Sequence, residues 1–505
     1  MNQQYDVIIV GSGAGGGTLA HALAPTGARI LILERGDFIP QEAENWSPEA
    51  VWRDLRYRTP EHWSNGRGRL FRPYMHYCVG GNTKFWGSVL FRLRREDFRE
   101  IEHVDGVSPA WPIDYETLVP YYERAERLYH VHGDHTLDPT EPPRGPFPHP
   151  PVAHAPRIEE IVDGLRRQGL HPSPLPLGLR DNCVYCDTCN SFACKVHAKS
   201  DAAVCCINEA IGRPNVTLFT NTEAHRLVTD SRGGRVVAVE ASRHGERIRL
   251  EAPLFVVSCG AVNSAALLLR SNDVHREGLA NSSGLVGKRY MAHLATMMQG
   301  VDFGRENDTK FQKTVAINDF YFKGPDTNYP LGQIQSQGRT HPIMAQQGGP
   351  WWITPLSRPV PLKYYQWYVR HGVDWLMMSE DLPSLANRVT VENGRIHLHY
   401  HRSNARAHKE LVRQAKRVLR PVGLRFPVPP MSLGMSNTTH QCGTLCFGTE
   451  PRASVLDPFC RAHDVENLFV VDASFFPSSA AVNPGLTIIA QALRVAEHIT
   501  ATDLK

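Results

Sequence analysis

The chain has 505 residues, more than a single hydrophobic core usually supports, so two joined domains are expected. Apolar residues make up 42% of the sequence and charged residues 21%, which is the balance of an ordinary soluble globular protein. The net charge of +4 is spread over mixed signs and forms no basic stripe, so the sequence gives little support for nucleic-acid binding.

Two observations bear on membranes and on the cellular compartment. The uncharged stretch 252–269 is long enough for a membrane span, but Ser258, Asn263 and Ser264 interrupt it, and it is interpreted as a buried strand, a turn and a helix. The first apolar strand begins at Tyr5 and leaves no room for an export signal. We therefore expect no membrane span and a cytoplasmic location, where the eleven cysteines would serve as thiols or metal ligands rather than form disulfides.

The first predicted unit is a strand, a glycine turn, a helix and a second strand within residues 5–35. The run from Val10 through Ala14 to the helix contains Gly11, Gly13 and Gly16 at the spacing G-x-G-x-x-G. In this pattern the first glycine permits a tight turn, the second lets a pyrophosphate approach the backbone, and the third lets the helix pack on the sheet. The helix start then offers free N–H groups to the phosphates.

An acidic residue ends the second strand of this unit. Glu34 lies eighteen residues after Gly16, where a carboxylate can accept hydrogen bonds from both ribose hydroxyls. The neighbouring Arg35 could serve a 2′-phosphate, but Glu34 would repel such a group, so NADP is disfavoured. Strand, turn, helix and terminal acid together predict a dinucleotide site.

The predicted secondary structure changes several times along the middle of the chain. A helix is predicted for 115–129, and the eight prolines of 139–156 indicate an ordered surface excursion or a linker rather than a helix or central strand. Short strands are predicted for 216–257, and β-rich segments with aromatic clusters for about 297–402. Period-two alternation in this last part places three glutamines on one face, namely Gln333, Gln335 and Gln337.

Four cysteines lie close together in the sequence. The spacing of Cys183, Cys186, Cys189 and Cys194 is typical of zinc or iron–sulfur sites, but it departs from the bacterial ferredoxin run. Structural thiols, a structural zinc ion and a redox cluster all remain open at this stage. The choice bears on the electron acceptor, because a cluster implies a quinone or a partner redox protein, whereas its absence permits direct reaction with O₂.

The C-terminal part reads as a second half of the dinucleotide site. Residues 440–444, 467–474 and 483–487 predict a strand, a turn and a helix that offer one histidine and one asparagine to the same place.

These motifs, together with residues 78–87 and 260–264, resemble the glucose–methanol–choline family of flavin oxidoreductases over nearly the whole chain. The resemblance implies FAD in an α/β fold, with a Rossmann-like domain and a discontinuous β-rich substrate domain. Residues 78–87 are similar to the family's second glycine motif. The other positions implied to contact the cofactor, apart from those of the first glycine loop, Glu34 and Arg35, are Gly80, Gly81, Asn82, Ala224, Asp472, Ala473, Asn483, Pro484 and Thr487.

The resemblance also implies a chemistry. His440 is placed as the base that takes the hydroxyl proton, and Asn483 as the partner that holds the substrate oxygen. In pyranose oxidases of the family a histidine attaches FAD covalently, and Phe85 stands at that place here, so we expect non-covalent FAD. The expected domain boundaries are 1–110, 201–296 and 431–505 for FAD binding, 111–200 for the proline- and cysteine-rich excursion, and 297–430 for the substrate.

The substrate expectation depends on the glutamine face and on an aromatic cluster. Sugars offer ring hydroxyls to amides and apolar faces to aromatic rings, although such a cluster can equally be core or a subunit interface. Within the family the chain is most similar to bacterial pyranose and glycoside oxidases or dehydrogenases, which oxidise C2 or C3 hydroxyls. A steroid or aliphatic alcohol oxidase is the enzymatic alternative, and a flavin-holding redox subunit is the non-enzymatic one. The aromatic residues are Trp351, Trp352, Tyr364, Tyr365, Trp367, Tyr368 and Trp375.

Overall fold

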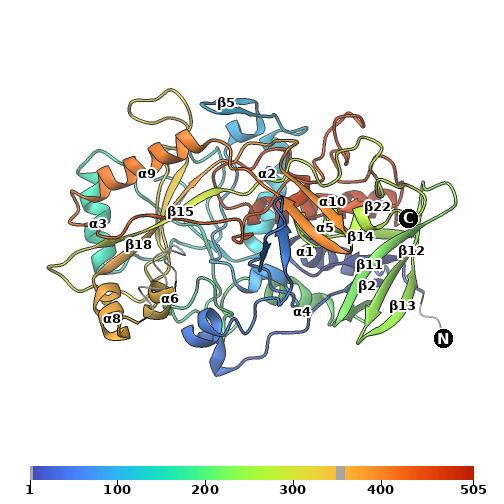
Figure 1. The fold of residues 1–505 in the computed structure, drawn as a ribbon, viewed down its shortest axis with the longest axis horizontal. Coiled ribbons are helices and arrows are strands. Elements are labelled where there is room, and N and C mark those ends of the chain that lie inside the picture. Colours follow the sequence, from blue (N-terminus) through green and yellow to red (C-terminus); the bar gives the residue numbers. More distant parts are fainter. Residues whose placement is uncertain (1–3, 348–358, 505) are drawn as a thin grey trace.

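The computed structural model describes residues 4–347 and 359–504. Its two largest sheets lie at opposite ends of the molecule, and the chain crosses between them several times (Figure 1). One sheet is parallel and lies near the C-terminus, and the other is antiparallel. This arrangement confirms the predicted α/β class with a Rossmann-like part and additional β-sheets.

The parallel sheet has five strands in the order β10-β2-β1-β14-β22. Every residue of β1 and β2 is buried, as expected for parallel strands covered by helices. The strands are Val7–Val10 (β1), Ile30–Leu33 (β2), Val216–Phe219 (β10), Leu254–Val257 (β14) and Leu468–Val470 (β22), and the nearby helices are Ala14–Leu23 (α1), Ala261–Arg270 (α5) and Gly485–Thr502 (α10).

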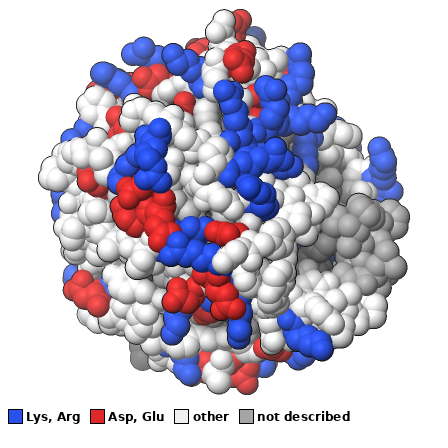
Figure 2. All heavy atoms as spheres, turned by 90° about the vertical axis from the view of Figure 1, so that its left-hand side faces the viewer, with Lys and Arg blue, Asp and Glu red and all other residues white. Residues whose placement is uncertain are grey.

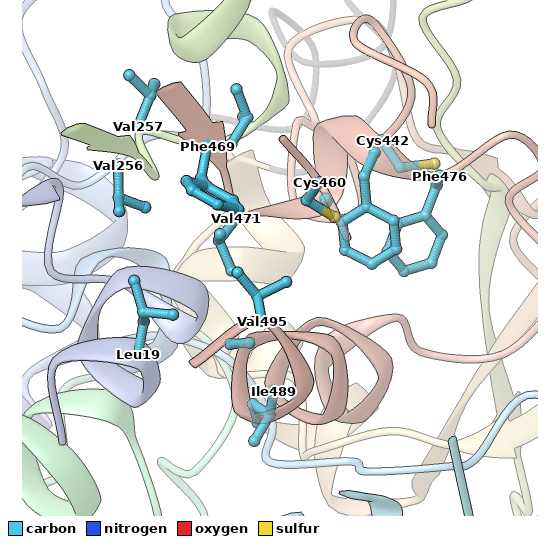
Figure 3. Packing of buried hydrophobic residues seen from close by; sticks show 14 of the residues in the cluster. Leu19, Val256, Val257, Cys442, Cys460, Phe469, Val471, Phe476, Ile489 and Val495 are labelled. Carbon is cyan, nitrogen blue, oxygen red and sulfur yellow. The ribbon is translucent and has the colours of Figure 1, made fainter. Parts of the chain in front are cut away.

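The core beside this sheet joins the two ends of the chain (Figure 3). Leu19 of α1 and Val495 of α10 are completely buried in the same cluster as Val257 of β14 and Phe469 of β22. Since residues from both ends share one core, the N-terminal and C-terminal segments form a single structural unit.

The antiparallel sheet has six strands in the order β21-β15-β18-β17-β16-β8. Helices α3 and α9 bury one face of it, and the alternate residues Val373 and Trp375 of β18 point into that core. Asp374 and Leu376 therefore point to the other face, which borders the main cavity. The strands are Met431–Ser432 (β21), Leu294–Val301 (β15), Gly372–Ser379 (β18), Gln333–Ser336 (β17), Val315–Ile317 (β16) and Ser173–Pro174 (β8), and the helices are Pro156–Arg166 (α3) and Ala405–Leu419 (α9).

Smaller elements complete the fold. An antiparallel sheet of β11, β12 and β13 extends beside the parallel sheet, and helix α2 packs against α10. Positive φ angles at Asn393 and Gly394 form the tight turn between β19 and β20, a conformation that an Asn-Gly pair adopts readily. The bounds are Thr222–Thr229 (β11), Val236–Arg243 (β12), Glu246–Glu251 (β13), Arg388–Glu392 (β19), Arg395–His399 (β20), Trp63–Asn65 (β3), Leu70–Phe71 (β4), Ile101–His103 (β5), Gly106–Ser108 (β6), Val131–His132 (β7), Leu177–Gly178 (β9), Tyr115–Leu128 (α2), Asn208–Ala210 (α4), Pro342–Gln347 (α6) and Leu362–Arg370 (α8).

The surface carries charges of both signs. At the end of the molecule that bears α3, α8 and α9, basic side chains gather in the upper part of the view and acidic ones lie among them lower down (Figure 2). Among residues 4–347 and 359–504, no helix is long and apolar enough to cross a membrane.

Candidate active site

Two of the three glycines of the first motif, between β1 and the start of α1, stand where an added side chain would clash. A Cβ atom at Gly11 would lie 2.2 Å from the Ser258 carbonyl oxygen, and one at Gly16 would lie 2.1 Å from the Gly11 carbonyl oxygen. A Cβ atom at Gly13 would meet nothing within 4 Å, because this residue borders a cavity. Gly11 therefore permits the tight turn, Gly13 leaves the backbone open to a ligand, and Gly16 permits close packing of the helix, as the pattern predicts.

A fourth glycine of this loop joins the two chain ends. A Cβ atom at Gly15 would lie only 1.7 Å from the carbonyl oxygen of Val471, directly after β22. The spacing G-x-G-x-x-G does not single out this position. The need for glycine at this position comes from the last strand of the sheet, which lies beside the first helix.

The second glycine loop closes over the first. Gly80 and Gly81 both have positive φ angles, and the Gly80 N–H donates to the Ser12 hydroxyl at 3.0 Å. A Cβ atom at Gly81 would lie 3.3 Å from the Cα atom of Gly13. The Asn82 side-chain oxygen accepts a hydrogen bond from the backbone N–H of His76 at 3.0 Å, which fixes the loop.

The acidic residue at the end of β2 is buried beside these loops. Glu34 accepts hydrogen bonds from the Ser12 N–H at 3.2 Å and from the Gly36 N–H at 3.1 Å, and burial raises the pKa of its carboxyl group. Arg35 forms ion pairs with Glu61 and Glu223, each at 3.2 Å. The guanidinium charge is thus already compensated by two carboxylates within the protein.

The carboxylate of Asp472 links its own segment, after β22, to the start of α5 and to Ser474, on the other side of the glycine loops. This carboxylate accepts hydrogen bonds from the Gly260 N–H at 2.9 Å and the Ser474 N–H at 2.8 Å, and burial raises its pKa. The hydroxyl of Thr487 bonds the Tyr122 hydroxyl at 2.8 Å, on the side of α10 that packs against α2.

A cavity of about 1070 Å³ runs from the glycine loops to the antiparallel sheet. Four of the positions predicted to contact cofactor or substrate do not border it: Gly16, Gly80, Thr487 and Gln333. The predicted residues that do line it are Gly11, Gly13, Ala14, Glu34, Arg35, Gly81, Asn82, Ala224, Gln335, Gln337, His440, Asp472, Ala473, Asn483 and Pro484.

A chain of polar contacts orients His440 at the centre of this cavity. Nε2 of His293 lies 3.1 Å from the Ser479 carbonyl oxygen, which can only accept, so His293 carries its proton on Nε2. Its bare Nδ1 then accepts from Nδ1–H of His440 at 2.9 Å. Nε2 of His440 is left without a proton, and the Asn483 amide N–H donates to it at 3.4 Å.

The electrostatic surroundings keep both imidazoles neutral. Burial, followed by the neighbouring His293 and Lys313, lowers the pKa of His440 well below its ordinary value. Burial likewise lowers the pKa of His293. Near neutral pH the Nε2 atom of His440 therefore carries no proton, and its only contact within the described protein is the long 3.4 Å hydrogen bond from Asn483, as a general base at the cavity requires.

His293 is the site residue that the sequence did not indicate. It directly precedes β15 and stands 147 positions before its partner His440. No motif surrounds it, and only the pairing of distant segments brings the two rings together. Asn483 is the third member of this arrangement. Its side-chain oxygen is buried and has no hydrogen-bond partner within the described protein.

The antiparallel sheet forms the far wall of the cavity. Gln335 and Gln337 border the cavity, whereas the amide of Gln333 donates to Asn318 at 2.9 Å beyond its edge. The expected aromatic cluster is divided. Tyr364, Tyr365 and Tyr368 border the cavity, Trp367 is 49% exposed, Trp375 lies in the core, and Trp351 and Trp352 fall outside the described residues. The tyrosines come from helix α8, where the sequence predicted β-structure.

The four clustered cysteines also come together, but without the arrangement of a metal site. Cys183, Cys186, Cys189 and Cys194 are free thiols that line one small cavity. Within 4–347 and 359–504, no three histidine, cysteine or acidic side chains are placed to hold a metal ion. The zinc and iron–sulfur interpretations of their spacing therefore find no support in the structure.

Comparisons with known proteins agree with this geometry. Two models described as GMC oxidoreductase match residues 5–295 and 390–492. The chain is 30% identical to 6'''-hydroxyparomomycin C oxidase of Streptomyces lividus and to paromamine 6'-oxidase of Streptomyces fradiae, covering 98% of this chain and 92% and 91% of theirs. The crystal structure of pyridoxine 4-oxidase from Mesorbium loti superposes with a TM-score of 0.70 at 19% identity over 99% of both chains. The chain therefore belongs to the GMC (glucose–methanol–choline) family and is an FAD-dependent oxidoreductase that acts on CH–OH groups.

Proposed function

We propose that the protein oxidises a secondary hydroxyl group of a sugar or glycoside, at C2 or C3, to a ketone. The observation that carries this proposal is the chain of contacts from His293 through His440 to Asn483, which leaves one unprotonated imidazole nitrogen at a cavity with amide side chains on its far wall. Two relatives named for their action on paromomycin-type compounds support a carbohydrate-like substrate.

The residues of the glycine loops fit FAD. Open space at Gly13 leaves the backbone accessible to a pyrophosphate, and Glu34 borders the cavity where a ribose would lie. When bound, FAD supplies the acceptor for the hydride that leaves the alcohol carbon. O₂, a quinone or a partner redox protein would take the electrons afterwards.

The protein's own residues manage the proton. Nε2 of His440 accepts the proton of the substrate hydroxyl, while His293 holds the opposite nitrogen and so keeps the ring in the required tautomer. The second N–H of the Asn483 amide would donate to the substrate oxygen in this proposal. Positioned acid–base catalysis of this kind contributes roughly 10²- to 10⁴-fold to the rate.

The cavity wall also offers an argument for a different substrate. Met297, Leu376 and Leu433 form an apolar patch beside the glutamines, which would suit a steroid or an aliphatic alcohol. Anaerobic titration of the purified protein separates the two classes. Bleaching of the flavin band by methyl glucoside but not by a long-chain alcohol is expected, and the reverse pattern would transfer the proposal to the apolar class.

FAD is expected to be bound without a covalent link. Phe85 borders the cavity and stacks on His76 with ring centroids 3.8 Å apart, and it stands where the resemblance to pyranose oxidases would put their histidine anchor. A benzene ring offers no nucleophile, so acid precipitation should leave all yellow colour in the supernatant. Flavin that stays with the precipitate through denaturing chromatography would contradict this expectation.

Glu34 is expected to contribute to cofactor affinity. The Glu34→Gln variant keeps the side-chain shape but removes a charged hydrogen-bond acceptor, and FAD binding should weaken by about 10- to 100-fold. Asp37→Asn is the matched control, because Asp37 lies on the same connection but does not border the cavity. Equal dissociation constants for FAD in the two variants and in the parent protein would remove Glu34 from the site.

A further inference from the structure

One buried cation borders the cavity but takes no part in the proton transfer or in the cofactor site described above. Lys313 precedes β16, is only 3% exposed and borders the main cavity. Its ammonium group stands against the second glycine loop, because a Cβ atom at Gly87 would lie 1.7 Å from Nζ of Lys313. It also lies near enough to His440 to influence that ring electrostatically.

No protein group compensates the charge of Lys313 within the described ranges. No carboxylate pairs with its Nζ and no atom accepts a hydrogen bond from it there, although it can donate three. The groups that face it are Lys199, the neutral thiol of Cys189 and His440. Lys199 is a second cation, whose own hydrogen bonds go to the carbonyl oxygens of Phe192 and Lys84.

The acidic residues of the neighbourhood are engaged elsewhere. Asp201 pairs with Lys84 at 3.0 Å, and Asp374 on the far wall accepts from the Thr340 N–H at 2.7 Å. A buried charge that lacks both a counter-ion and hydrogen bonds is strongly unfavourable in a protein interior. The position is therefore one that an anion entering the cavity would stabilise.

Unused amide groups border the same cavity. Both polar atoms of the Gln335 side chain and the side-chain oxygen of Gln337 are buried without hydrogen-bond partners. The Asn190 side-chain oxygen lies 3.0 Å from the same Cβ position at Gly87. A cavity that holds an ammonium group and also offers amide donors is chemically suited to a carboxylate or a phosphate, with amide oxygens left for hydroxyl groups.

We propose that Lys313 forms an anion subsite, which binds a carboxylate or phosphate group of the alcohol substrate beside the reacting carbon. This inference rests on the proposed function, since it assigns the charge of the substrate that His440 deprotonates. It also implies that this chain differs in substrate charge from the relative named for paromamine, because an amine-bearing glycoside would place a second cation in one enclosed space with Lys313.

A matched series of glycosides tests the subsite. Methyl glucoside, methyl glucuronide, methyl glucoside 6-phosphate and methyl 6-amino-6-deoxyglucoside share one ring and differ only in the group at C6. Binding is measured by calorimetry to the FAD-loaded His440→Ala variant, in which slow turnover does not interfere. The glucuronide or the phosphate should bind about 10- to 100-fold tighter than the neutral glycoside, and the amine more weakly than it.

Variants of Lys313 in the same background complete the test. Lys313→Met keeps the length but removes the charge and should abolish the preference for the anion, whereas Lys313→Arg should retain it. Flavin content confirms folding in each case. Tighter binding of the carboxylate identifies a carboxylate subsite and tighter binding of the phosphate a phosphate subsite. Equal affinities across the series, or a preference for the amine, would overturn the inference.

A pH series provides a measurement that needs no Lys313 variant. Burial lowers the pKa of Lys313 to about 8. A lysine is charged below its pKa, so the preference for the anion should be present at pH 6–7 and decline as the pH rises through about 8. A preference that is unchanged up to pH 10 would contradict the assignment. If every glycoside fails to bind or to reduce the flavin, the proposed function fails instead.

Discussion

Replacement of His440 by alanine should leave FAD bound but slow the reduction of the flavin by substrate roughly 10²- to 10⁴-fold. The expectation follows from the geometry, because Nε2 of this ring is the base that the chain of contacts holds at the cavity. Rapid mixing of the oxidised protein with glycoside in the absence of oxygen measures the rate directly.

The neighbouring residue supplies the control for that experiment. Thr439 also borders the cavity, but its hydroxyl bonds only the Asn437 side chain, so Thr439→Ala should reduce flavin at nearly the parental rate. A His440→Ala protein with normal flavin content and an unchanged rate would show that another group removes the proton.

Replacement of His293 by leucine should slow the same step by about 10- to 100-fold, because His440 loses the acceptor that fixes its tautomer. His293→Asn is the matched variant, since an amide oxygen can take the place of Nδ1 and accept from His440. We expect this variant to keep most of the parental rate. Equal losses in both variants would indicate that the second ring only fills space.

The pH dependence separates positioning from packing. His440 must be neutral to act, so the rate falls as the pH drops through its pKa, which burial and then His293 and Lys313 place well below the ordinary value. Removal of His293 takes away one of these causes and should move the acid limb to higher pH. An acid limb that stays in place in His293→Leu would argue against electrostatic coupling of the two rings.

The local parts of the site could be predicted from the sequence. The turn at Gly11, the strand that ends at Glu34 and the alternation that places Gln335 and Gln337 on one face depend on neighbouring residues alone, and each lies where the pattern predicts. Backbone conformation and strand periodicity are set locally, which is why these elements can be recognised without knowledge of the fold.

The parts that depend on tertiary contacts could not be predicted. Three features depend on segments that are far apart in the chain. They are the pairing of His293 with His440, the close approach of Gly15 to Val471, and the surroundings that leave the charge of Lys313 unpaired. Nothing in the sequence around these residues distinguishes them from structural ones. Resemblance to a family identified His440 and Asn483 but not the residues that orient them.

Two features of the chain could not be settled from local sequence, for separate physical reasons. Residues 362–370 form helix α8 although their tyrosines and tryptophan favour strands, because strand propensity depends strongly on context. The cysteine spacing leaves structural thiols, zinc and a redox cluster open, because spacing along the chain does not fix the directions of the side chains. The four thiols line a common cavity without the geometry that a metal ion needs.

The central claim is that the protein removes hydrogen from a carbon-bound hydroxyl of a sugar, with His440 as the base. The most direct measurement is mass analysis of the sugar after a single anaerobic turnover with the FAD-loaded protein. We expect a keto-sugar that has lost two hydrogens in proportion to the flavin reduced, and almost none with His440→Ala. A flavin that stays oxidised with every glycoside, or that is reduced while the sugar is unchanged, would contradict it.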